Sequence, residues 1–377
     1  MIRLERRVET PRWLDVAVPL ASFVAALVVG GLVLQLTGHS ALGTYERIVE
    51  RALTSDGALS GTLVAATPLL FTGLAAAVAF RMNVFNIGGE GQLVLGAIAA
   101  SGAGLALEGR PGWLIIGAMV VAGAAAGAAW AAIPGALRAF TGTNEIITSL
   151  MLNYVAANLA TYLIFGSRSF WRSLEGSGAT FPTGKRLPPE ASWPSLELGG
   201  VVVPFGFLLG VAGAVVLLVV LRATRFGFAM RVVADAPAAA RYAGIRGRRV
   251  VLGVMALSGA AAGIGGASNI GDTRHVLDPR GLNQAGYGYA GIVVAALARL
   301  NPVAVVFVSI VMGGLANAGR ALQGPDFPAG LVGTLQGLLL VFTLGGEVFA
   351  RYRIRRARTV HEAHAGAPPP PTAEVTA

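Results

Sequence analysis

Long apolar segments alternate with short polar ones along most of the chain. Ten segments are apolar enough to cross a membrane as helices, near residues 15–37, 59–80, 90–107, 114–137, 145–165, 201–221, 250–271, 287–300, 302–319 and 331–349. Most have about 20 residues, which an α-helix needs to cross roughly 30 Å of hydrocarbon. The eighth is shorter, and we expect a half-helix or a re-entrant element there. The pattern predicts an all-α, polytopic transmembrane bundle of about ten spans over residues 15–349.

The composition supports a membrane protein. The 377 residues are 54% hydrophobic and 13% charged, and the mean hydropathy is +0.66. A soluble domain usually carries about 25% charged residues. The chain contains no cysteine, so the sequence offers neither a disulfide framework nor a thiolate metal site.

The basic residues predict how the chain is oriented. An even number of spans puts both termini on one side, and with that side in the cytoplasm 19 of the 29 basic residues lie in cytoplasmic segments. Residues 1–14 then form a cytoplasmic segment, and residues 350–377 a basic, then disordered, cytoplasmic tail. This topology also explains the net charge of +10. We expect no nucleic-acid binding, since no basic run alternates with exposed aromatic residues.

A Gly-rich break separates the second and third segments. Residues 80–100 are FRMNVFNIGGEGQLVLGAIAA, and glycines 88, 89 and 91 interrupt the helix. A helix that restarts near Glu90 has free backbone N–H groups, which attract acceptors and negative charge. Asn83, Asn86 and Gln92 can satisfy other backbone groups. Irregular backbone at membrane depth must be buried in protein or line a water-filled cavity, so the four side chains are candidates for a pathway. The alternative is a surface loop with Arg81 at the membrane interface.

Two further polar clusters follow. In GTNEIITSLMLNYVAANLA, Asn144 opens the fifth span as a helix cap, and Asn153 lies inside the span. Such an amide either bonds a neighbouring helix or lines a pathway. Asn269 and Tyr287 belong to a late cluster, which is loosened by glycines 286 and 288. Two Gly-interrupted segments in separate halves are typical of the internal repeats of transporters.

The basic segment 222–249 contains a short helical pattern. We expect a helix with Asp235 as N-cap, a proline in its first turn and Gly244 as its stop. Ala239, Tyr242 and Ala243 share one face of this helix, and Ile245 follows it. The helix is suited to meet a partner. The alternative is a solvated basic loop that only sets the topology.

Paired glycines predict close helix packing. Glycines 123 and 127, 206 and 210, 259 and 263, and 333 and 337 are each four residues apart, which puts both members on one helix face. Each pair is suited to packing within the chain, or alternatively to a subunit interface.

The sequence lacks the motifs of enzymes. It contains no phosphate-binding loop, no H-E-x-x-H zinc motif and no G-x-S-x-G nucleophile elbow. The pair His361 and His364 has the wrong spacing for that zinc motif. We therefore expect no catalytic residues, no metal site and no cofactor.

Four stretches together resemble the permease subunits of ATP-binding-cassette importers, in the branch of branched-chain amino acid, sugar and nucleoside permeases. They are FRMNVFNIGGEGQLVLGA, GTNEIITSLMLNYVA, ARYAGI and GYGYAGIVVAALARLNP, and they look closest to the nucleoside or simple-sugar subgroup. The resemblance extends from about residue 59 to residue 347. It implies a multi-pass permease of the bacterial inner membrane that translocates solute without hydrolysing ATP itself.

The resemblance also implies partners. It predicts cytoplasmic ATPase subunits, an external solute-binding protein and a second, paralogous permease subunit, while the residues leave homodimer and heterodimer open. Asp235, Ala239, Tyr242, Ala243, Gly244 and Ile245 correspond to the coupling helix that docks on the ATPase. Solute would pass between the permeases along the polar segments. The alternative is an ion-gradient-driven secondary transporter, which is expected to use carboxylates inside the membrane; only Glu90 and Glu145 come near that role.

Overall fold

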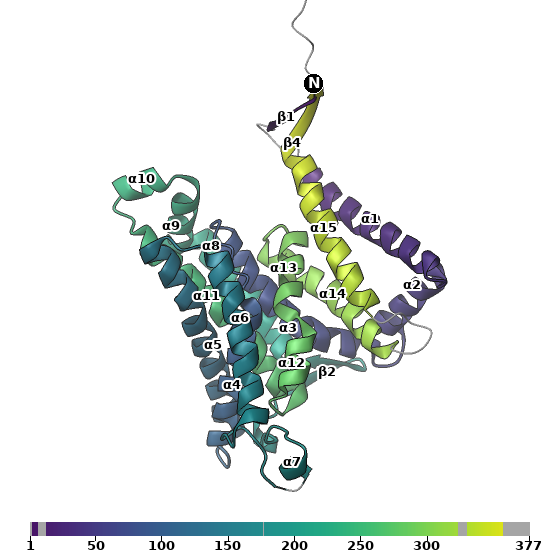
Figure 1. Cartoon of the computed structure of the whole chain (residues 1–377), viewed down its shortest axis with the longest axis vertical. Coiled ribbons are helices and arrows are strands. Elements are labelled where there is room, and N and C mark those ends of the chain that lie inside the picture. Colours follow the sequence, from purple (N-terminus) through teal and green to yellow (C-terminus); the bar gives the residue numbers. More distant parts are fainter. Residues whose placement is uncertain (1, 7–12, 176, 323–329, 357–377) are drawn as a thin grey trace, which may run out of the picture.

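The computed structural model describes residues 2–6, 13–175, 177–322 and 330–356. Helices dominate this part of the chain (Figure 1). The predicted disordered tail lies mostly outside the described residues. The first seven of its residues, 350–356, complete the last helix and add a short strand.

The elements follow one another in this order: β1 (Ile2–Arg6), α1 (Leu14–Leu36), α2 (Ala41–Val49), α3 (Ala58–Phe80), α4 (Gly89–Ala106), α5 (Gly112–Ala136), α6 (Glu145–Thr161), α7 (Ser177–Thr180), β2 (Ser195–Leu198), β3 (Val201–Pro204), α8 (Phe205–Ala223), α9 (Arg225–Asp235), α10 (Pro237–Tyr242), α11 (Gly247–Ser268), α12 (Pro279–Ala285), α13 (Tyr287–Leu297), α14 (Pro302–Ala321), α15 (Leu331–Arg351) and β4 (Tyr352–Arg356). Four helices are joined to short π-helical turns: η1 (Glu50–Thr54), η2 (Leu137–Thr141), η3 (Tyr162–Gly166) and η5 (Asn269–Arg274). A 3-10 turn, η4 (Pro189–Ala191), lies in the loop before β2.

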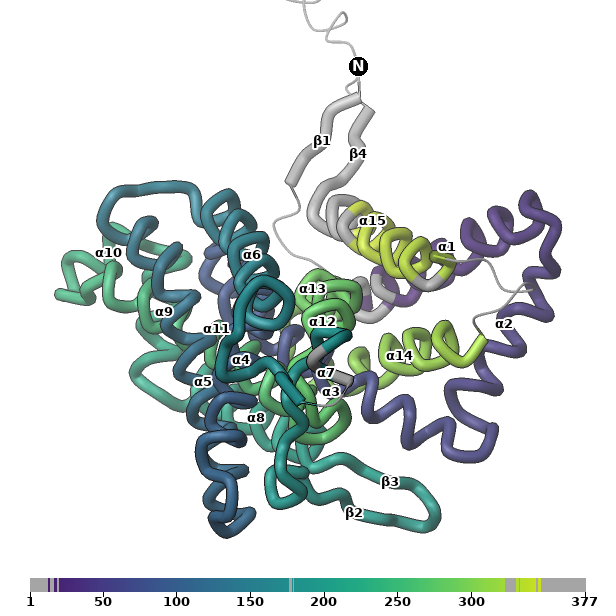
Figure 2. The backbone as a smooth tube through the Cα atoms, turned by 60° about the horizontal axis from the view of Figure 1, so that its bottom comes forward, coloured from purple at the N-terminus to yellow at the C-terminus, as the bar shows by residue number. Residues whose placement is uncertain are grey.

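Helix α3 forms the centre of the bundle. It packs against α11, α13, α14 and α8, and nearly all of its residues are buried. Its sequence is rich in alanine and leucine on every side, which suits a helix surrounded by other helices. Figure 2 shows α4, α5, α6 and α11 on one side of this centre and α1, α2, α14 and α15 on the other.

Helices α5 and α11 are held together by interlocking glycines. A Cβ added at Gly123 or Gly127 of α5 would collide with the backbone of Gly263 or Gly259 of α11, and the reverse also holds. These two pairs therefore pack within the chain, as the spacing predicts. Gly333 and Gly337 differ, since no other atom lies within 4 Å of a Cβ added at either glycine.

The number of spans is only partly confirmed. Among the described residues, six helices, some counted with their π-helical turns, are long and apolar enough to cross a membrane: α3, α5, α6, α8, α11 and α14. Two shorter apolar stretches lie in α1 and α15, at Leu20–Leu36 and Gly333–Thr343. This establishes a polytopic helical membrane protein, whereas the count of ten stays a prediction. The expected sixth span was wrong at its start, because residues 201–204 form the strand β3 and the helix begins only at Phe205.

The expected eighth span is a half-helix. Helix α13 has 11 residues, so it rises only about 16 Å, half the thickness of the hydrocarbon. It ends at a turn whose carbonyl at Leu300 accepts a hydrogen bond from Arg81 Nε, 2.9 Å away. Its first turn is therefore well inside the bundle, about halfway along the neighbouring helices.

Strands β1 and β4, the first and last elements of the described residues, lie at the same end of the molecule as the basic segment. Strands β1 and β4 pair antiparallel, and Figure 1 shows them at the same end as α9 and α10. Residues Arg222 and Arg231 of the basic segment lie near Arg81. The loop 166–200, with α7 and the β2–β3 hairpin, is at the opposite end. We call the first of these the basic end.

Candidate functional site

The loop between α3 and α4 starts at the surface and ends inside the protein. Arg81 and Asn83 are exposed, while Asn86 and the first turn of α4 are buried. Asn83 adopts a left-handed conformation with φ of 54°, which asparagine tolerates better than most residues. The surface-loop interpretation therefore holds only up to Phe85, and from Asn86 onward the backbone is enclosed by protein.

Two buried amides close the inner part of this loop. Asn86 and Gln92 exchange two hydrogen bonds, each 2.9 Å long. Asn86 Nδ2 also donates to the hydroxyl of Ser258 on α11, and that hydroxyl donates to the carbonyl of Ala75 on α3. The chain of bonds links α3, α4 and α11, and it leaves the two amides turned toward each other.

Asn153, on α6, reaches the same loop from the side. Its Oδ1 accepts from the N–H of Gly91 at 2.9 Å, and its Nδ2 donates to the carbonyl of Ile87 at 3.0 Å. Nδ2 also donates to the hydroxyl of Tyr289 on α13, 3.2 Å away. One amide thus ties together the starts of α4 and α13. This is the bonding to neighbouring elements that is expected of an amide buried in a membrane helix.

Glu90 caps a helix other than its own. Its Oε2 accepts from the N–H of Gly288, 2.5 Å away, in the first turn of α13, which has no cap from its own preceding residue. A carboxylate is favoured there by the free N–H groups and by the helix dipole. We expected Glu90 to stabilise a helix end inside the protein; this is confirmed, but the helix is α13 rather than α4.

Glycine allows the two helix starts to meet. A Cβ at Gly288 would lie 2.6 Å from the Cα of Glu90 and 2.7 Å from the carbonyl carbon of Gly89. Both values are far below an ordinary van der Waals contact. We call this meeting of residues 86–92 with residues 286–289 the junction. It joins the two Gly-interrupted segments that the sequence placed in separate halves.

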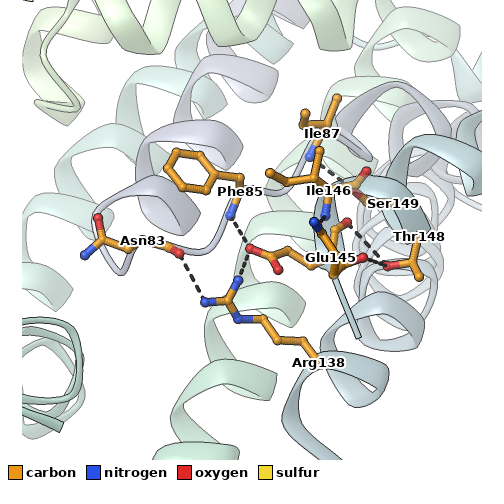
Figure 3. Close-up of polar contacts among 9 residues, drawn as sticks. Asn83, Phe85, Ile87, Arg138, Glu145, Ile146, Thr148 and Ser149 are labelled. Carbon is orange, nitrogen blue, oxygen red and sulfur yellow. Dashed lines mark hydrogen bonds and ion pairs between the residues drawn. The ribbon is translucent and has the colours of Figure 1, made fainter. Parts of the chain in front are cut away.

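An ion pair holds the outer part of the loop. Arg138 of η2 pairs with Glu145, the first residue of α6, and Arg138 also donates to the carbonyl of Asn83 at 3.2 Å. Glu145 in turn accepts from the N–H of Phe85 at 3.0 Å. Figure 3 shows the guanidinium between the loop and the carboxylate. Glu145 is buried and paired, so it offers no free carboxylate.

The eight predicted pathway residues do not all gather. Asn86, Glu90, Gln92 and Tyr287 belong to the junction, and Asn153 bonds to it from α6. Tyr287 is buried, and its carbonyl accepts from the hydroxyl of Thr72. The other three residues, Asn83, Asn144 and Asn269, lie outside it.

Each outlying residue has a local explanation. Asn144 is exposed and caps α6 by accepting from the N–H of Ile146, so the predicted cap is confirmed. Asn83 contacts Arg138 through its backbone carbonyl, which accepts a hydrogen bond from the guanidinium, and not through its side-chain amide. Asn269 lies past the far end of α11, and its Oδ1 is buried without a hydrogen-bond partner in the described structure.

The junction reaches the surface at Tyr289. This side chain is partly exposed, and its hydroxyl receives the hydrogen bond from buried Asn153. Beside it, α6 presents exposed Tyr154 and Asn158, and Tyr162 begins η3 four residues later. We call these three residues the α6 stripe; together with the apolar Val155 and Leu159 they line a shallow cavity of about 480 Å³. Neither the stripe nor Ser258 was predicted, although the i, i+4, i+8 spacing of two tyrosines and an asparagine was a visible signal for the stripe.

The short helix that the sequence predicts in the basic segment is present, with one correction. Helix α10 begins at Pro237 with Ala236 as its N-cap, and the chain leaves it at Gly244 with φ of 72°. Asp235 is not the N-cap, because α9 continues through it. Ala239, Tyr242 and Ala243 are exposed, and Tyr242 is 95% exposed. An unpartnered aromatic side chain at the tip of the basic end is suited to a binding partner.

Similar proteins are known for nearly the whole chain. A glucose ABC transporter permease protein, TsgB13 of Haloferax volcanii, is 35% identical over 94% of this chain and 93% of its own length. A guanosine ABC transporter permease protein, NupP of Bacillus subtilis, is 30% identical over 79% of this chain and 84% of its own. A nucleoside ABC transporter permease protein, NupB of Lactococcus lactis, is 28% identical over 87% and 90%. No solved structure matches the chain.

A family model covers the part of the chain that holds the junction and α10. It is described as the permease component of the branched-chain amino acid transport system, and it matches residues 58–344. Both ends of the junction, the α6 stripe and the docking helix lie within those residues. The chain therefore belongs to the family of branched-chain amino acid transport system permease components.

Proposed function

We propose that this permease forms the membrane pathway of an importer for a nucleoside or a simple sugar. The solute arrives from an external binding protein, and separate cytoplasmic ATPase subunits supply the energy. The observation that carries the proposal is the junction, because two broken helices meet inside the bundle and Asn153 joins their polar groups to the hydroxyl of the partly exposed Tyr289.

The pathway follows the exposed side of the junction. Asn86, Glu90, Gln92 and Asn153 are engaged with one another or with backbone, so they hold the broken helices in place. The groups that remain open are Tyr289 and the α6 stripe. Their hydroxyl and amide groups can hydrogen-bond a neutral polar solute, and their aromatic faces can stack on a base or a sugar ring. Asn83, Asn144, Asn269 and Tyr287 remain candidates by position only.

The α6 stripe also suggests a second permease. One protomer presents this face as an open surface, whereas a solute must be surrounded during transfer. A paralogous subunit that faces the stripe closes the pathway between the two chains. The α6 stripe and the corresponding residues of the second subunit would then line one pathway between the two chains.

Helix α10 is the proposed site of coupling to the ATPase. Asp235, Ala239, Tyr242, Ala243 and Gly244 are exposed there, and Ile245 connects the helix to α11. Movement of α10 reaches α11 directly, and α11 contacts α3, α4 and α5. Through α11 a displacement at the basic end reaches the helices that carry the junction. Strands β1 and β4 are at this end, and the proposed orientation places both termini in the cytoplasm of a bacterial cell.

A secondary transporter gains no support from the carboxylates. Glu145 is paired with Arg138, and Glu90 accepts from Gly288 through Oε2, while its Oε1 is buried without a hydrogen-bond partner among the described residues. A proton- or sodium-coupled mechanism needs a carboxylate that exchanges its partner during transport.

The test is uptake by the complex in proteoliposomes. The chain is reconstituted with its ATPases, second permease and binding protein, and radiolabelled nucleosides and pentoses are offered in parallel. We expect accumulation of one of these classes that needs ATP, stops with vanadate and survives an ionophore. Accumulation that follows the ion gradient and ignores ATP would contradict the proposal.

The matched variants are Asn158→Leu and Tyr154→Ala on the stripe, with Val121→Ala on exposed α5 as a control. We expect the stripe variants to lower uptake at least fivefold without lowering the ATPase content of the complex. Unchanged uptake in both would remove the stripe from the pathway.

A further inference from the structure

A cavity of about 540 Å³ lies at the basic end, outside the junction and away from the α6 stripe. It is bounded by η2, by the turn after α10 and by the first turns of α11. Its lining includes four arginines, Arg241, Arg246, Arg248 and Arg249, and three apolar residues, Phe140, Ile245 and Leu252. We call it the basic cavity.

The charges of the basic cavity are not neutralised within the described chain. All four arginines are exposed, and the ion pairs found among the described residues involve only Arg138 with Glu145 and Arg274 with Asp278. The guanidinium of Arg248 lies over the ring of Phe140, 5.7 Å from its centre, which leaves its edge N–H groups open. Four cations around one hollow repel one another unless an anion is bound there.

The start of α11 adds to the positive electrostatic potential of the basic cavity. Its N-cap, Arg246, provides no side-chain acceptor for the first turn, and Gly247 of that turn also lines the cavity. The free N–H groups and the helix dipole favour negative charge at this point. The arginines and the start of α11 therefore favour an anion at the same place in the cavity.

The depth of the basic cavity matches the edge of a bilayer. Phe140, near the end of the membrane-spanning segment Gly112–Thr141, and the first residues of the segment Gly247–Arg274 line it. Phe140 is 60% exposed although it belongs to a spanning segment. The cavity therefore lies where two spanning segments reach the boundary between hydrocarbon and headgroups.

We propose that the basic cavity binds an anionic phospholipid, with the phosphate held by the arginines and the first acyl carbons lying against Phe140 and Leu252. Arginine binds phosphate oxygens through two parallel N–H groups, and basic pockets between membrane helices on the cytoplasmic side suit anionic headgroups. A bound lipid would join η2, the turn after α10 and α11, so it would fix the base of the docking helix. This site lies beyond the proposed transport function and does not depend on the solute.

An acidic protein surface fits the cavity less well than a lipid does. Phe140 belongs to the end of a spanning segment, and a protein partner would leave its exposed ring in contact with hydrocarbon. The exposed tip of α10, Tyr242, is outside this cavity. The experiment below distinguishes a lipid from a protein occupant.

The experiment measures lipid retained by the full-length chain. The protein is purified in a mild detergent, incubated with phosphatidylglycerol or phosphatidylcholine, and analysed by native mass spectrometry and thermal unfolding. The variant is Arg246→Gln/Arg249→Gln. The control is Arg110→Gln/Arg168→Gln, which removes two exposed arginines at the opposite end.

We expect the wild-type chain to retain phosphatidylglycerol in preference to phosphatidylcholine and to unfold at a higher temperature with it. The cavity variant should bind phosphatidylglycerol about tenfold more weakly, at about 1 kcal/mol or less per lost arginine, while the control variant retains it. If the double variant unfolds without lipid, the single variant Arg241→Gln, at an exposed position, replaces it and should weaken retention by a smaller factor.

Three results would overturn the proposal. Equal retention by the cavity and control variants would show that the lipid binds elsewhere. An equal thermal shift with inorganic phosphate alone would assign the site to a free anion. Loss of the ATPase from the complex of the cavity variant, with lipid retention unchanged, would assign the cavity to the protein partner.

Discussion

The junction and the basic end contain similar polar side chains in opposite states. At the junction, Asn86, Gln92 and Asn153 are buried, and each is hydrogen-bonded to another group of the chain. At the basic end, the arginines around α10 and the ring of Tyr242 are exposed, with few contacts within the described chain.

This difference in burial indicates that the junction stabilises the fold, whereas the basic end is a surface for binding. A buried polar group without its partner costs about 1–3 kcal/mol, whereas an exposed one costs almost nothing because water replaces the partner. Changes at the junction should therefore lower the stability of the permease. Changes at the basic end should leave stability intact and affect association.

Replacing Gly288 with alanine should have the largest effect on stability. The new Cβ would overlap the backbone of Glu90 and Gly89, which cannot rotate away as a side chain can. We expect a loss at or above the upper end of about 1–3 kcal/mol, seen as a lower unfolding midpoint in detergent and little monodisperse protein. The control is Gly117→Ala on α5, where a Cβ meets no atom within 4 Å and the midpoint should stay or rise slightly. Equal midpoints for both variants would show that the two helix starts do not need to touch.

Replacing Asn153 with leucine comes next. The change removes the partners of the Gly91 N–H, the Ile87 carbonyl and the Tyr289 hydroxyl, so about 2–3 kcal/mol should be lost. Asn158→Leu, one turn further along α6, is the matched control, since Asn158 is exposed and donates only to the carbonyl of Tyr154 within its own helix. The comparison breaks down if Asn158→Leu lowers the unfolding midpoint as much as Asn153→Leu.

The pair Arg138 and Glu145 should give an intermediate effect. Arg138→Gln leaves a buried carboxylate without its cation and should cost more than Glu145→Gln. A double-mutant cycle should give a coupling energy of about 1–2 kcal/mol. The same cycle on the more exposed pair Arg274 and Asp278 should give about 0.5 kcal/mol or less. Equal coupling energies for the two pairs would mean that the burial of Glu145 does not strengthen its ion pair with Arg138.

Replacing Tyr242 with alanine should have the smallest effect on stability and a large one on association. Its side chain is 95% exposed, so the unfolding midpoint should not change. A buried aromatic anchor at an interface is often worth about 2 kcal/mol or more, so ATPase retention on a column should fall about thirtyfold. Tyr154→Ala, an exposed tyrosine of α6, should leave that retention unchanged. Full retention by Tyr242→Ala would remove the tip of α10 from the docking surface.

Local features of this fold could be predicted from the sequence because each depends on neighbouring residues. The restart of a helix near Glu90 follows from three glycines within four residues, and the cap at Asn144 follows from an asparagine before a helical run. The docking helix follows from a proline at its start and a glycine at its end. The prediction of Asp235 as an N-cap was wrong because it also relied on local signals alone. Helix α9 is capped by Thr224 and extends to Asp235, so Asp235 ends one helix instead of starting the next.

The contacts of the junction could not be predicted in the same way. Nothing in the spacing of Glu90 indicates that its partner is Gly288, since that contact is decided by how α3, α4 and α13 pack. Ser258 was hidden as a lone serine among alanines and glycines. Asn269 was grouped with Tyr287 because they are close in sequence, but η5 and α12 lie between them and carry the chain from the far end of α11 back to mid-depth.

The hydrogen bond between Glu90 and Gly288 sets an order for biogenesis. The two residues are 198 positions apart, so at about 5–20 residues per second the carboxylate waits roughly 10–40 s on the ribosome-bound chain for its partner. During that time the carboxyl of Glu90 has no Gly288 N–H to accept from. The contact between the two helix starts can therefore form only after α13 has been made, when most of the bundle already exists.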